Sequence, residues 1–217
     1  MMNKDRSDQM EEEKLAVLNE SGERIGVRSR SEIHAKGYWH ETFHCWFAGY
    51  NADLKETFIY FQLRSDNKKD FPGLLDITAA GHILSDEKIE DGVREVHEEL
   101  GINVQFEELE DLGIVKGELI QGEMIDREHT NVFLYTKPVS YAEIQLQPEE
   151  VAGIFRSTLA DFKSLIQQDK AEIELEGFVV TQEGGKNYVN HKVGYHHFVP
   201  HAKSYLLEII DRIERKV

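Results

Sequence analysis

Short apolar runs alternate with polar, turn-rich stretches along this chain, and the runs have the length of β-strands. Each run is mostly apolar and is bounded by turn residues, which is the pattern of a buried or half-buried strand. The pattern predicts strands at Phe43 to Ala48, Phe58 to Leu63, Thr130 to Thr136 and, after a turn at Pro148, Val151 to Arg156. A further pair of short runs, Ala16 to Leu18 and Arg24 to Val27, flanks a turn and predicts a small hairpin.

Other segments carry apolar residues at helical spacing. Leu159 to Gln167 predicts a short helix, and a longer one is expected from about Pro200 to Arg215. The apolar residues of the last helix fall on one stripe, which indicates core packing or a dimer contact: Tyr205, Leu206, Ile209, Ile210 and Ile213. The segment Ile173 to Val199 suggests a hairpin or flap. Short strands and helices therefore alternate along the chain.

We expect one domain with appendages, because 217 residues can bury a proper core and no low-complexity linker divides them. Residues 1–14 are expected to form a flexible N-terminal tail, and residues 15–217 the folded domain. Within this domain, a core of about residues 15–168 would be followed by a C-terminal extension of about residues 169–217.

A short helix is predicted within residues 81–102. Acidic residues between positions 86 and 91 would lie near its start, where the helix dipole favours anions. Gly101 stands just past Leu100, at the position where glycine commonly ends a helix.

Three glutamates of this helix share one face. Glu95, Glu98 and Glu99 are spaced i, i+3 and i+4, so their side chains point the same way. Carboxylates placed in this way repel one another, and a hard divalent cation with oxygen ligands would offset the repulsion. A solvated acidic helix laced with salt bridges is the alternative that the glutamates alone leave open.

Together with the glycine before it, the helix resembles the Nudix box, which reads G, five residues, E, seven residues, then R-E-U-x-E-E-x-G-U with U aliphatic. REVHEELGI, from Arg94 onward, matches the second half at every specified position. Gly81 and Glu87 have the right separation, but only six residues lie between Glu87 and Arg94. We place the missing residue in the loop that leads into the helix, because a loop absorbs a deletion readily. The role of Glu87 is therefore open, while Gly81 would permit a tight turn from strand to helix.

This resemblance implies an α/β fold, the Nudix-type α-β-α sandwich with a central mixed sheet, followed here by a C-terminal helical extension. It implies that Glu95, Glu98 and Glu99 bind Mg²⁺, with Mn²⁺ as an alternative cation. Arg94 would orient the carboxylates, and Glu98 or Glu99 would be the first candidate for the catalytic base, with Glu128 second.

Motifs outside the box resemble the Nudix proteins related to type I isopentenyl-diphosphate isomerase, over about Leu15 to Ile166. They are QLRSDNKKD, FPGLLDITAAGH and DREHTNVFLYT. The isomerase carries a catalytic cysteine where this chain has Ala80, and an alanine cannot transfer a proton. The only cysteine of the chain, Cys45, lies away from that motif.

The same resemblance implies further site residues. It maps His82 and Asp126 to metal ligands, and Glu128 to the second acid of the isomerase. Basic residues of the loop after the second apolar strand would hold diphosphate oxygens, although without the resemblance they read as a solubilising loop: Arg64, Lys68 and Lys69.

Two groups of histidines give weaker indications of a metal site or a substrate pocket. His34, His40 and His44 do not reproduce the spacing of the isomerase's N-terminal metal ligands, so core or pocket histidines are the alternative to a metal role. The second group could line a substrate pocket but lacks the spacing of a zinc site: His191, His196, His197 and His201. Glu149 and Glu150 stand where some Nudix hydrolases carry an extra base, but a solvated turn is the simpler interpretation.

The composition of the chain argues against several classes of binding partner. A formal net charge of −16 argues against binding to nucleic acid or to an anionic membrane. No apolar run approaches the ~20 residues that span a bilayer, and the N-terminus lacks the apolar region of a signal peptide. A single cysteine fits a reducing cytoplasm.

These features predict a cytoplasmic, Mg²⁺-dependent Nudix pyrophosphohydrolase that cleaves a diphosphate linkage in a nucleoside-diphosphate-like or organic diphosphate substrate. Hydrolysis needs only metal and water, so it survives the loss of the isomerase cysteine. The alternatives are an isomerase-like enzyme and a non-catalytic module that binds a nucleotide or a diphosphate. A homodimer is common in this fold and is compatible with the sequence.

Overall fold

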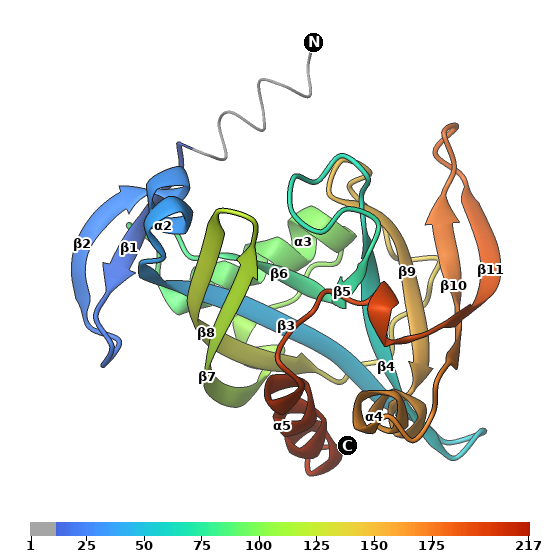
Figure 1. Cartoon of the computed structure of the whole chain (residues 1–217). Coiled ribbons are helices and arrows are strands. Elements are labelled where there is room, and N and C mark those ends of the chain that lie inside the picture. The colour runs from blue at the N-terminus through green and yellow to red at the C-terminus, as the bar shows by residue number, and fades with distance from the viewer. Residues whose placement is uncertain (1–11) are drawn as a thin grey trace.

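Eleven strands form one sheet at the centre of residues 12–217, the part of the chain that the computed structural model describes (Figure 1). The strands are β1 (Lys14–Leu18), β2 (Arg24–Ser29), β3 (Trp39–Asn51), β4 (Glu56–Arg64), β5 (Leu75–Ile77), β6 (Ala79–His82), β7 (Glu110–Gln121), β8 (Met124–Tyr135), β9 (Val151–Thr158), β10 (Ile173–Val180) and β11 (Lys186–Val193). The main path runs β11-β10-β9-β4-β3-β1-β2, with β5 paired to β4, β6 and β8 to β3, and β7 to β8. β3 and β8 run parallel whereas the other ladders between these strands are antiparallel, so the predicted mixed sheet is confirmed.

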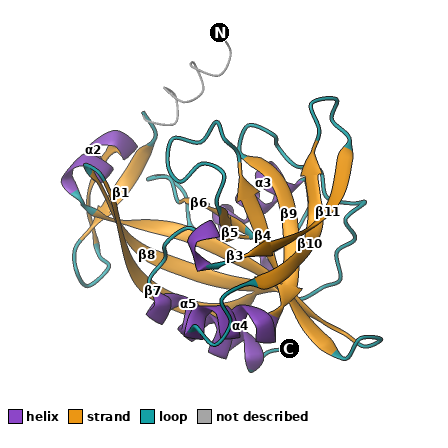
Figure 2. Ribbon diagram, turned by 45° about the vertical axis from the view of Figure 1, so that its right-hand side comes forward, coloured by secondary structure: helices purple, strands orange, loops and turns teal. Residues whose placement is uncertain are grey.

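Helices cover both faces of the sheet because the central strands alternate their buried side chains. The helices are α2 (Arg30–Lys36), α3 (Arg94–Leu100), α4 (Leu159–Gln167) and α5 (Lys203–Glu214), with 3₁₀ helices at Ile89–Val93, Phe106–Glu108 and Tyr195–His197. On β3, Phe43 and Phe47 belong to the buried layer that includes Leu100 of α3, whereas Trp46 belongs to the layer with Phe162 of α4. Figure 2 shows α4 and α5 together on one side of the sheet, and the predicted α-β-α sandwich is confirmed.

Most predicted elements are present, with shifted ends. β3, β4, β8 and β9 cover the four predicted strands, and β1 and β2 form the predicted hairpin. α4 has the predicted bounds, while α5 is a little shorter than predicted at both ends. Helix α2 and strand β7 were not predicted, because neither carries a long apolar run.

The C-terminal extension begins with strands, and its α-helix, α5, lies at its end. β10 pairs with β9, and β11 pairs with β10, so residues 173–193 widen the sheet before the chain reaches α5. Of the expected tail, residues 1–11 lie outside the described part of the chain, and Lys14 already begins β1. Across residues 12–217, no helix combines the length and the apolar character that a membrane crossing requires.

Candidate catalytic and metal-binding site

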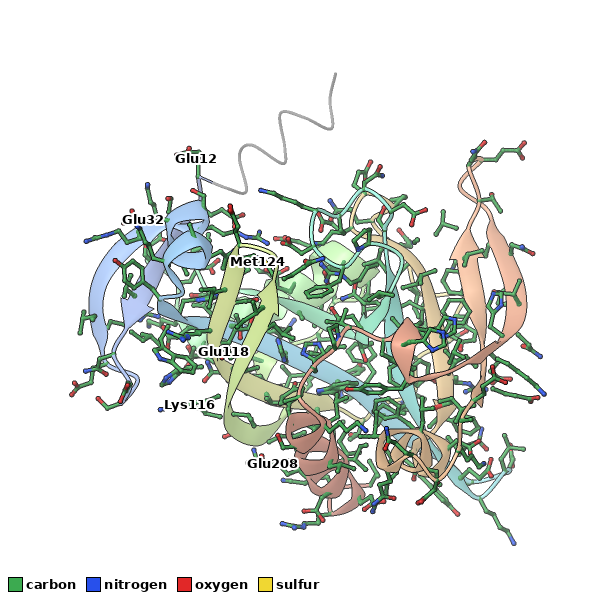
Figure 3. The ribbon with its side chains drawn as sticks, viewed as in Figure 1. Glu12, Glu32, Lys116, Glu118, Met124 and Glu208 are labelled. Carbon is green, nitrogen blue, oxygen red and sulfur yellow. The ribbon has the colours of Figure 1, made fainter. Side chains whose placement is uncertain are left out.

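A cavity of about 430 Å³ is lined by side chains of β3, β6, β8, α2 and α3, and by the segment that leads into α5. The β7–β8 hairpin adds Leu119 and Met124, of which Figure 3 labels Met124. The charged lining residues include the glutamates of α3, a group of histidines with Asp126, several cations and further carboxylates such as Glu128 and Glu150.

The glutamates of α3 differ in exposure: Glu99 is buried, Glu95 is largely buried and Glu98 is exposed. Burial raises the pKa of Glu95 to about 7, and burial together with the neighbouring Glu95 carboxylate raises the pKa of Glu99 to about 8. Glu99 Oε2 accepts hydrogen bonds from Gln62 Nε2 at 3.2 Å and from the Ala80 N–H at 3.1 Å. The Glu98 side chain lines the same cavity but is 49% exposed. Two buried carboxylates one helical turn apart form a site that a divalent cation would neutralise.

Two glycines set the position of α3. Gly101 ends the helix as predicted, in a left-handed conformation with φ of 69°, and its N–H donates to the His97 carbonyl at 2.9 Å. The turn predicted at Gly81 is wrong, because Gly81 lies inside β6 and is not among the residues with positive φ. Glycine is needed there for a different reason: a Cβ atom would lie 2.1 Å from the Glu95 carboxyl carbon.

We expect Gly81→Ala to lower catalytic turnover by roughly tenfold to a hundredfold while the chain still folds. The added methyl group displaces the end of the flexible Glu95 side chain, and a misplacement of about 1 Å in a site can cost about a hundredfold in rate. The matched control is Gly26→Ala on β2, where a Cβ would meet its nearest neighbour at 3.9 Å. Steady-state kinetics and thermal melts of both variants test this. Full activity in Gly81→Ala would contradict the role of the close approach.

Arg94 ties α3 to the strand and loop before it. Its Nε donates to Glu87 Oε1 at 2.7 Å, and its Nη2 donates to Glu87 Oε2 at 3.1 Å and to the His82 carbonyl at 3.0 Å. Arg94 also forms an ion pair with Glu95. Burial acts to raise the pKa of Glu87, but hydrogen bonds from Arg94 and the Leu84 N–H hold it below its ordinary value. Glu87 is not among the lining residues of the cavity, so it positions Arg94 instead.

A 3₁₀ helix, Ile89–Val93, occupies the segment to which the sequence assigns the missing residue of the box. A 3₁₀ helix rises about 2.0 Å per residue against about 1.5 Å in an α-helix, so fewer residues cover the same distance. The α-helix predicted to start near residues 86–91 therefore begins only at Arg94. The pair between Glu87 and Arg94 forms despite the deletion.

Three histidines and an aspartate meet on another part of the cavity. His34, His40, His82 and Asp126 each offer one ligand atom, and the four atoms lie within 4.8 Å of one another. Within the described chain, His40 Nε2, His82 Nε2 and Asp126 Oδ1 are buried and have no hydrogen-bond partner. Burial lowers the pKa of His40 to about 3 and that of His82 well below its ordinary value, so both rings are neutral. Neutral imidazoles and a carboxylate suit Zn²⁺ or Mn²⁺, and buried polar atoms need such a partner.

The predicted metal ligands therefore separate into two groups. The sequence assigns metal binding to the glutamates of α3 and, through the resemblance, to His82 and Asp126, and the structure places His82 and Asp126 with His34 and His40. His44, the third member of the first histidine group, is not part of this cluster.

Glu128 lies on β8, two residues beyond Asp126, and lines the cavity. Burial raises its pKa well above the ordinary value, and the neighbouring Asp126 carboxylate raises it further. The Thr130 hydroxyl donates to Glu128 Oε2 at 3.2 Å.

Two of the three predicted diphosphate-binding residues reach the cavity. Arg64 lines it and donates from Nη1 to Asp76 Oδ2 at 3.0 Å. Lys68 lines it and forms an ion pair with Glu150. Lys69 is not among the lining residues. Of the second histidine group, only His201 lines this cavity. The Glu150 side chain also lines the cavity, so the interpretation of Glu150 as part of a solvated turn is wrong.

Arg30 and Glu13 also line the cavity and were not predicted as site residues; Arg30 Nη1 lies 3.7 Å from Glu13 Oε2. The sequence does mark the start of the helix that carries Arg30. Ser29 and Glu32 have the spacing of a capping box, and the Ser29 hydroxyl accepts from the Glu32 N–H at 3.3 Å. A helix that starts there places Arg30 and His34 on one face, one turn apart.

We expect the metal-free protein to lose stability as the pH rises from about 6.5 to about 8, above the range in which the lowered pKa values of the buried histidines have the opposite effect. The folded-state pKa values of Glu95 and Glu99, about 7 and about 8, lie above the ordinary value of 4.5. Below about pH 4.5 both carboxyl groups are protonated in the folded and the unfolded chain, and the stability is fully present. As the pH rises from there to the raised pKa, each group lowers the free energy of unfolding by ~1.4 kcal/mol per pH unit, because it ionises more readily in the unfolded chain. Thermal melts in a chelator and in Mg²⁺ test this, since the cation should restore stability mainly at pH 8. A flat profile in the chelator would contradict the expectation, and the double variant Glu95→Gln, Glu99→Gln should flatten it.

Comparison with known proteins finds relatives over most of the chain. Residues 50–178 match the family model described as NUDIX domain. An uncharacterized Nudix hydrolase of Clostridium acetobutylicum is 40% identical over 196 residues, which cover 90% of this chain and 94% of that protein. An isopentenyl-diphosphate Delta-isomerase of Aliivibrio fischeri is 31% identical over 147 residues, which cover 65% of this chain and 78% of that protein. A crystal structure from Deinococcus radiodurans is similar in fold, with a TM-score of 0.55 at 18% identity over 73% of this chain and 91% of that one.

Proposed function

The chain belongs to the NUDIX domain family of hydrolases, and we propose that it hydrolyses the diphosphate linkage of a small organic or nucleoside diphosphate with Mg²⁺ bound at α3. The observation that carries this proposal is the pair of the largely buried Glu95 and the buried Glu99, which faces a cavity also lined by cations. Both carboxylates have raised pKa values in the metal-free protein because they are buried, so they gain most from a bound cation.

The residues present fit a divalent cation. Gly81 leaves room for the Glu95 carboxylate, and Gln62 with the Ala80 N–H fixes the rotamer of Glu99. We assign Glu95 and Glu99 as the main ligands and Glu98 as a further one at the rim. When bound there, Mg²⁺ would neutralise charge that develops on the diphosphate and lower the pKa of a bound water.

The remaining steps fall to side chains of the chain itself. Arg64 and Lys68 are placed to hold diphosphate oxygens, and Arg30 on α2 is a third cation on the cavity wall. Glu98 is the preferred general base, because its half-exposed carboxylate lies at the rim of the cavity, where water has access, whereas Glu99 is buried and holds two hydrogen bonds. Glu128 is the second candidate.

We expect Glu98→Gln to lower kcat by about a hundredfold, the low end of what a general base contributes. Because its side chain is 49% exposed, the melting temperature should stay within a degree or two of the wild type. Glu90→Gln, also on the surface and outside the cavity lining, is the matched control. The assay is a Mg²⁺-supplemented screen over diphosphate compounds that reads phosphate released after phosphatase treatment. Unchanged turnover in Glu98→Gln would show that Glu98 is not the general base.

The isomerase alternative lacks an acid at the required position. Ala80 lines the cavity where the related isomerase carries its cysteine. Cys45 cannot replace that cysteine, because it follows His44 on β3, points to the opposite face of the sheet and is fully buried in the layer with Phe43. The non-catalytic alternative was suggested by the short box, yet the buried acidic pair and the Glu87–Arg94 bridge are intact.

A further inference from the structure

A buried chain of polar side chains leads from the C-terminal helix to the cavity. Trp46 Nε1 lies 3.3 Å from the hydroxyl oxygen of Tyr205, and this oxygen lies 2.8 Å from His44 Nδ1. The other ring nitrogen of His44, Nε2, lies 3.7 Å from Glu128 Oε2. Trp46, His44 and Tyr205 are 2%, 5% and 6% exposed, so water does not compete for these groups. Tyr205 belongs to α5, which follows the segment that Figure 1 shows crossing the sheet in red.

The direction of the hydrogen bonds follows from what each atom can do. The indole N–H of Trp46 can only donate, so the Tyr205 oxygen accepts from it. The hydroxyl proton of Tyr205 then needs an acceptor, because an unsatisfied buried donor is costly. Within residues 12–217, the other atom hydrogen-bonded to this hydroxyl is His44 Nδ1. Nδ1 must therefore accept, which leaves the ring proton on Nε2, the nitrogen that faces Glu128.

We propose that Tyr205 is a positioning residue that holds His44 in the Nε2–H tautomer and so directs an N–H donor at the Glu128 carboxylate. The significance of Glu128 rests on the proposed function, but the tautomer does not. The C-terminal extension thereby takes part in the site through a side chain that need not touch the substrate.

The tautomer matters because Glu128 Oε2 has two polar neighbours, the Thr130 hydroxyl and His44 Nε2. On the sheet side, the Thr42 hydroxyl donates to Thr130 at 3.1 Å, and Thr130 donates to Glu128 Oε2 at 3.2 Å. The other neighbour of Glu128 is the His44 ring, which contacts Tyr205 of α5. The opposite tautomer of His44 would turn the lone pair of Nε2 towards the same carboxylate. An N–H on Nε2 and the Thr130 hydroxyl would both point at the Glu128 carboxyl group and fix its orientation, whereas a lone pair on Nε2 would repel its oxygen.

The first test measures the resting wild-type chain and needs no substrate. Long-range ¹H–¹⁵N NMR spectra of the full chain, labelled with ¹⁵N at its ten histidines, distinguish a protonated from an unprotonated ring nitrogen. The His44 signals are assigned by their loss in His44→Gln. The proposal requires a protonated Nε2 and an unprotonated Nδ1 near neutral pH. A proton on Nδ1 would overturn it, whatever the enzyme hydrolyses.

The second test removes the hydroxyl group alone. In Tyr205→Phe the Nδ1–H tautomer of His44 should gain population, because Nδ1 loses its donor. Tyr141→Phe is the matched control: it deletes a hydroxyl that donates to the Glu176 carbonyl at 2.9 Å, outside the lining of the main cavity. The His44 signals should stay unchanged in this control. A His44 tautomer that is identical in wild type and in a folded Tyr205→Phe would reject the positioning role.

Discussion

Replacing Glu99 with Gln should lower kcat for Mg²⁺-dependent diphosphate hydrolysis by about a thousandfold, the upper range for loss of one preorganised electrostatic group. Glu99 is 6% exposed and shares the cavity with Glu95, one helical turn away. The amide oxygen of Gln can still accept from Gln62 and the Ala80 N–H. The substitution therefore removes negative charge while it preserves shape, and the loss of activity reports the loss of a cation ligand.

The same variant gives a second readout of opposite sign. Metal-free Glu99→Gln should melt at the same or a higher temperature than the wild type at pH 8, since the buried carboxylate, with its pKa raised to about 8, is a source of instability there. Glu107→Gln, an exposed residue outside the cavity lining, should change neither property. A folded Glu99→Gln variant with wild-type kcat would contradict the assignment of the cation site to α3.

Asp126→Asn should weaken the binding of Zn²⁺ or Mn²⁺ to the histidine group by more than about a hundredfold, since even groups behind the ligands contribute about ten- to a hundredfold. Asp126 Oδ1 lies 3.4 Å from His40 Nε2 and 3.6 Å from His34 Nε2, so it completes this cluster. An asparagine keeps the shape but removes the charge that a dication needs among neutral imidazoles. Isothermal titration of the metal-free chain with each cation measures the loss.

The control for this titration is Asp53→Asn in the exposed turn between β3 and β4, far along β3 from the cluster. Its affinity should equal that of the wild type. Because the glutamates of α3 form a separate group, Asp126→Asn should still bind Mg²⁺ at α3. Equal Zn²⁺ affinity in the wild type and Asp126→Asn would show that the histidine group does not hold the cation.

Local patterns were enough to predict much of the fold. The helix that ends at Gly101, the strand around Phe43 and the helix α4 each carry their own spacing of apolar and turn residues. α2 was not predicted because it is short and mostly polar, and its capping box is the one local signal that marks its start. The β10–β11 hairpin was only suggested, since its exposed strand is polar and its place at the sheet edge depends on pairing with β9.

The candidate site was predictable within α3 and less so beyond it. Glu95 and Glu99 follow from helical spacing together with the resemblance to the Nudix box, whereas the gathering of His34, His40 and Asp126 depends on how distant strands pair. β3 lies beside both β6 and β8, and that register brings together residues from four separate elements. The role predicted for Gly81 was wrong because the close approach of Glu95 is a tertiary contact.

The most direct measurement of the central claim is hydrolysis of a panel of diphosphates by the wild-type chain in H₂¹⁸O, with products analysed by mass spectrometry. The account predicts that at least one compound is cleaved only when a divalent cation is present. One product phosphate should carry a single ¹⁸O atom, and Glu99→Gln should nearly abolish its formation. Cleavage that needs no cation, or labelled product formed equally fast by a folded Glu99→Gln, would contradict it.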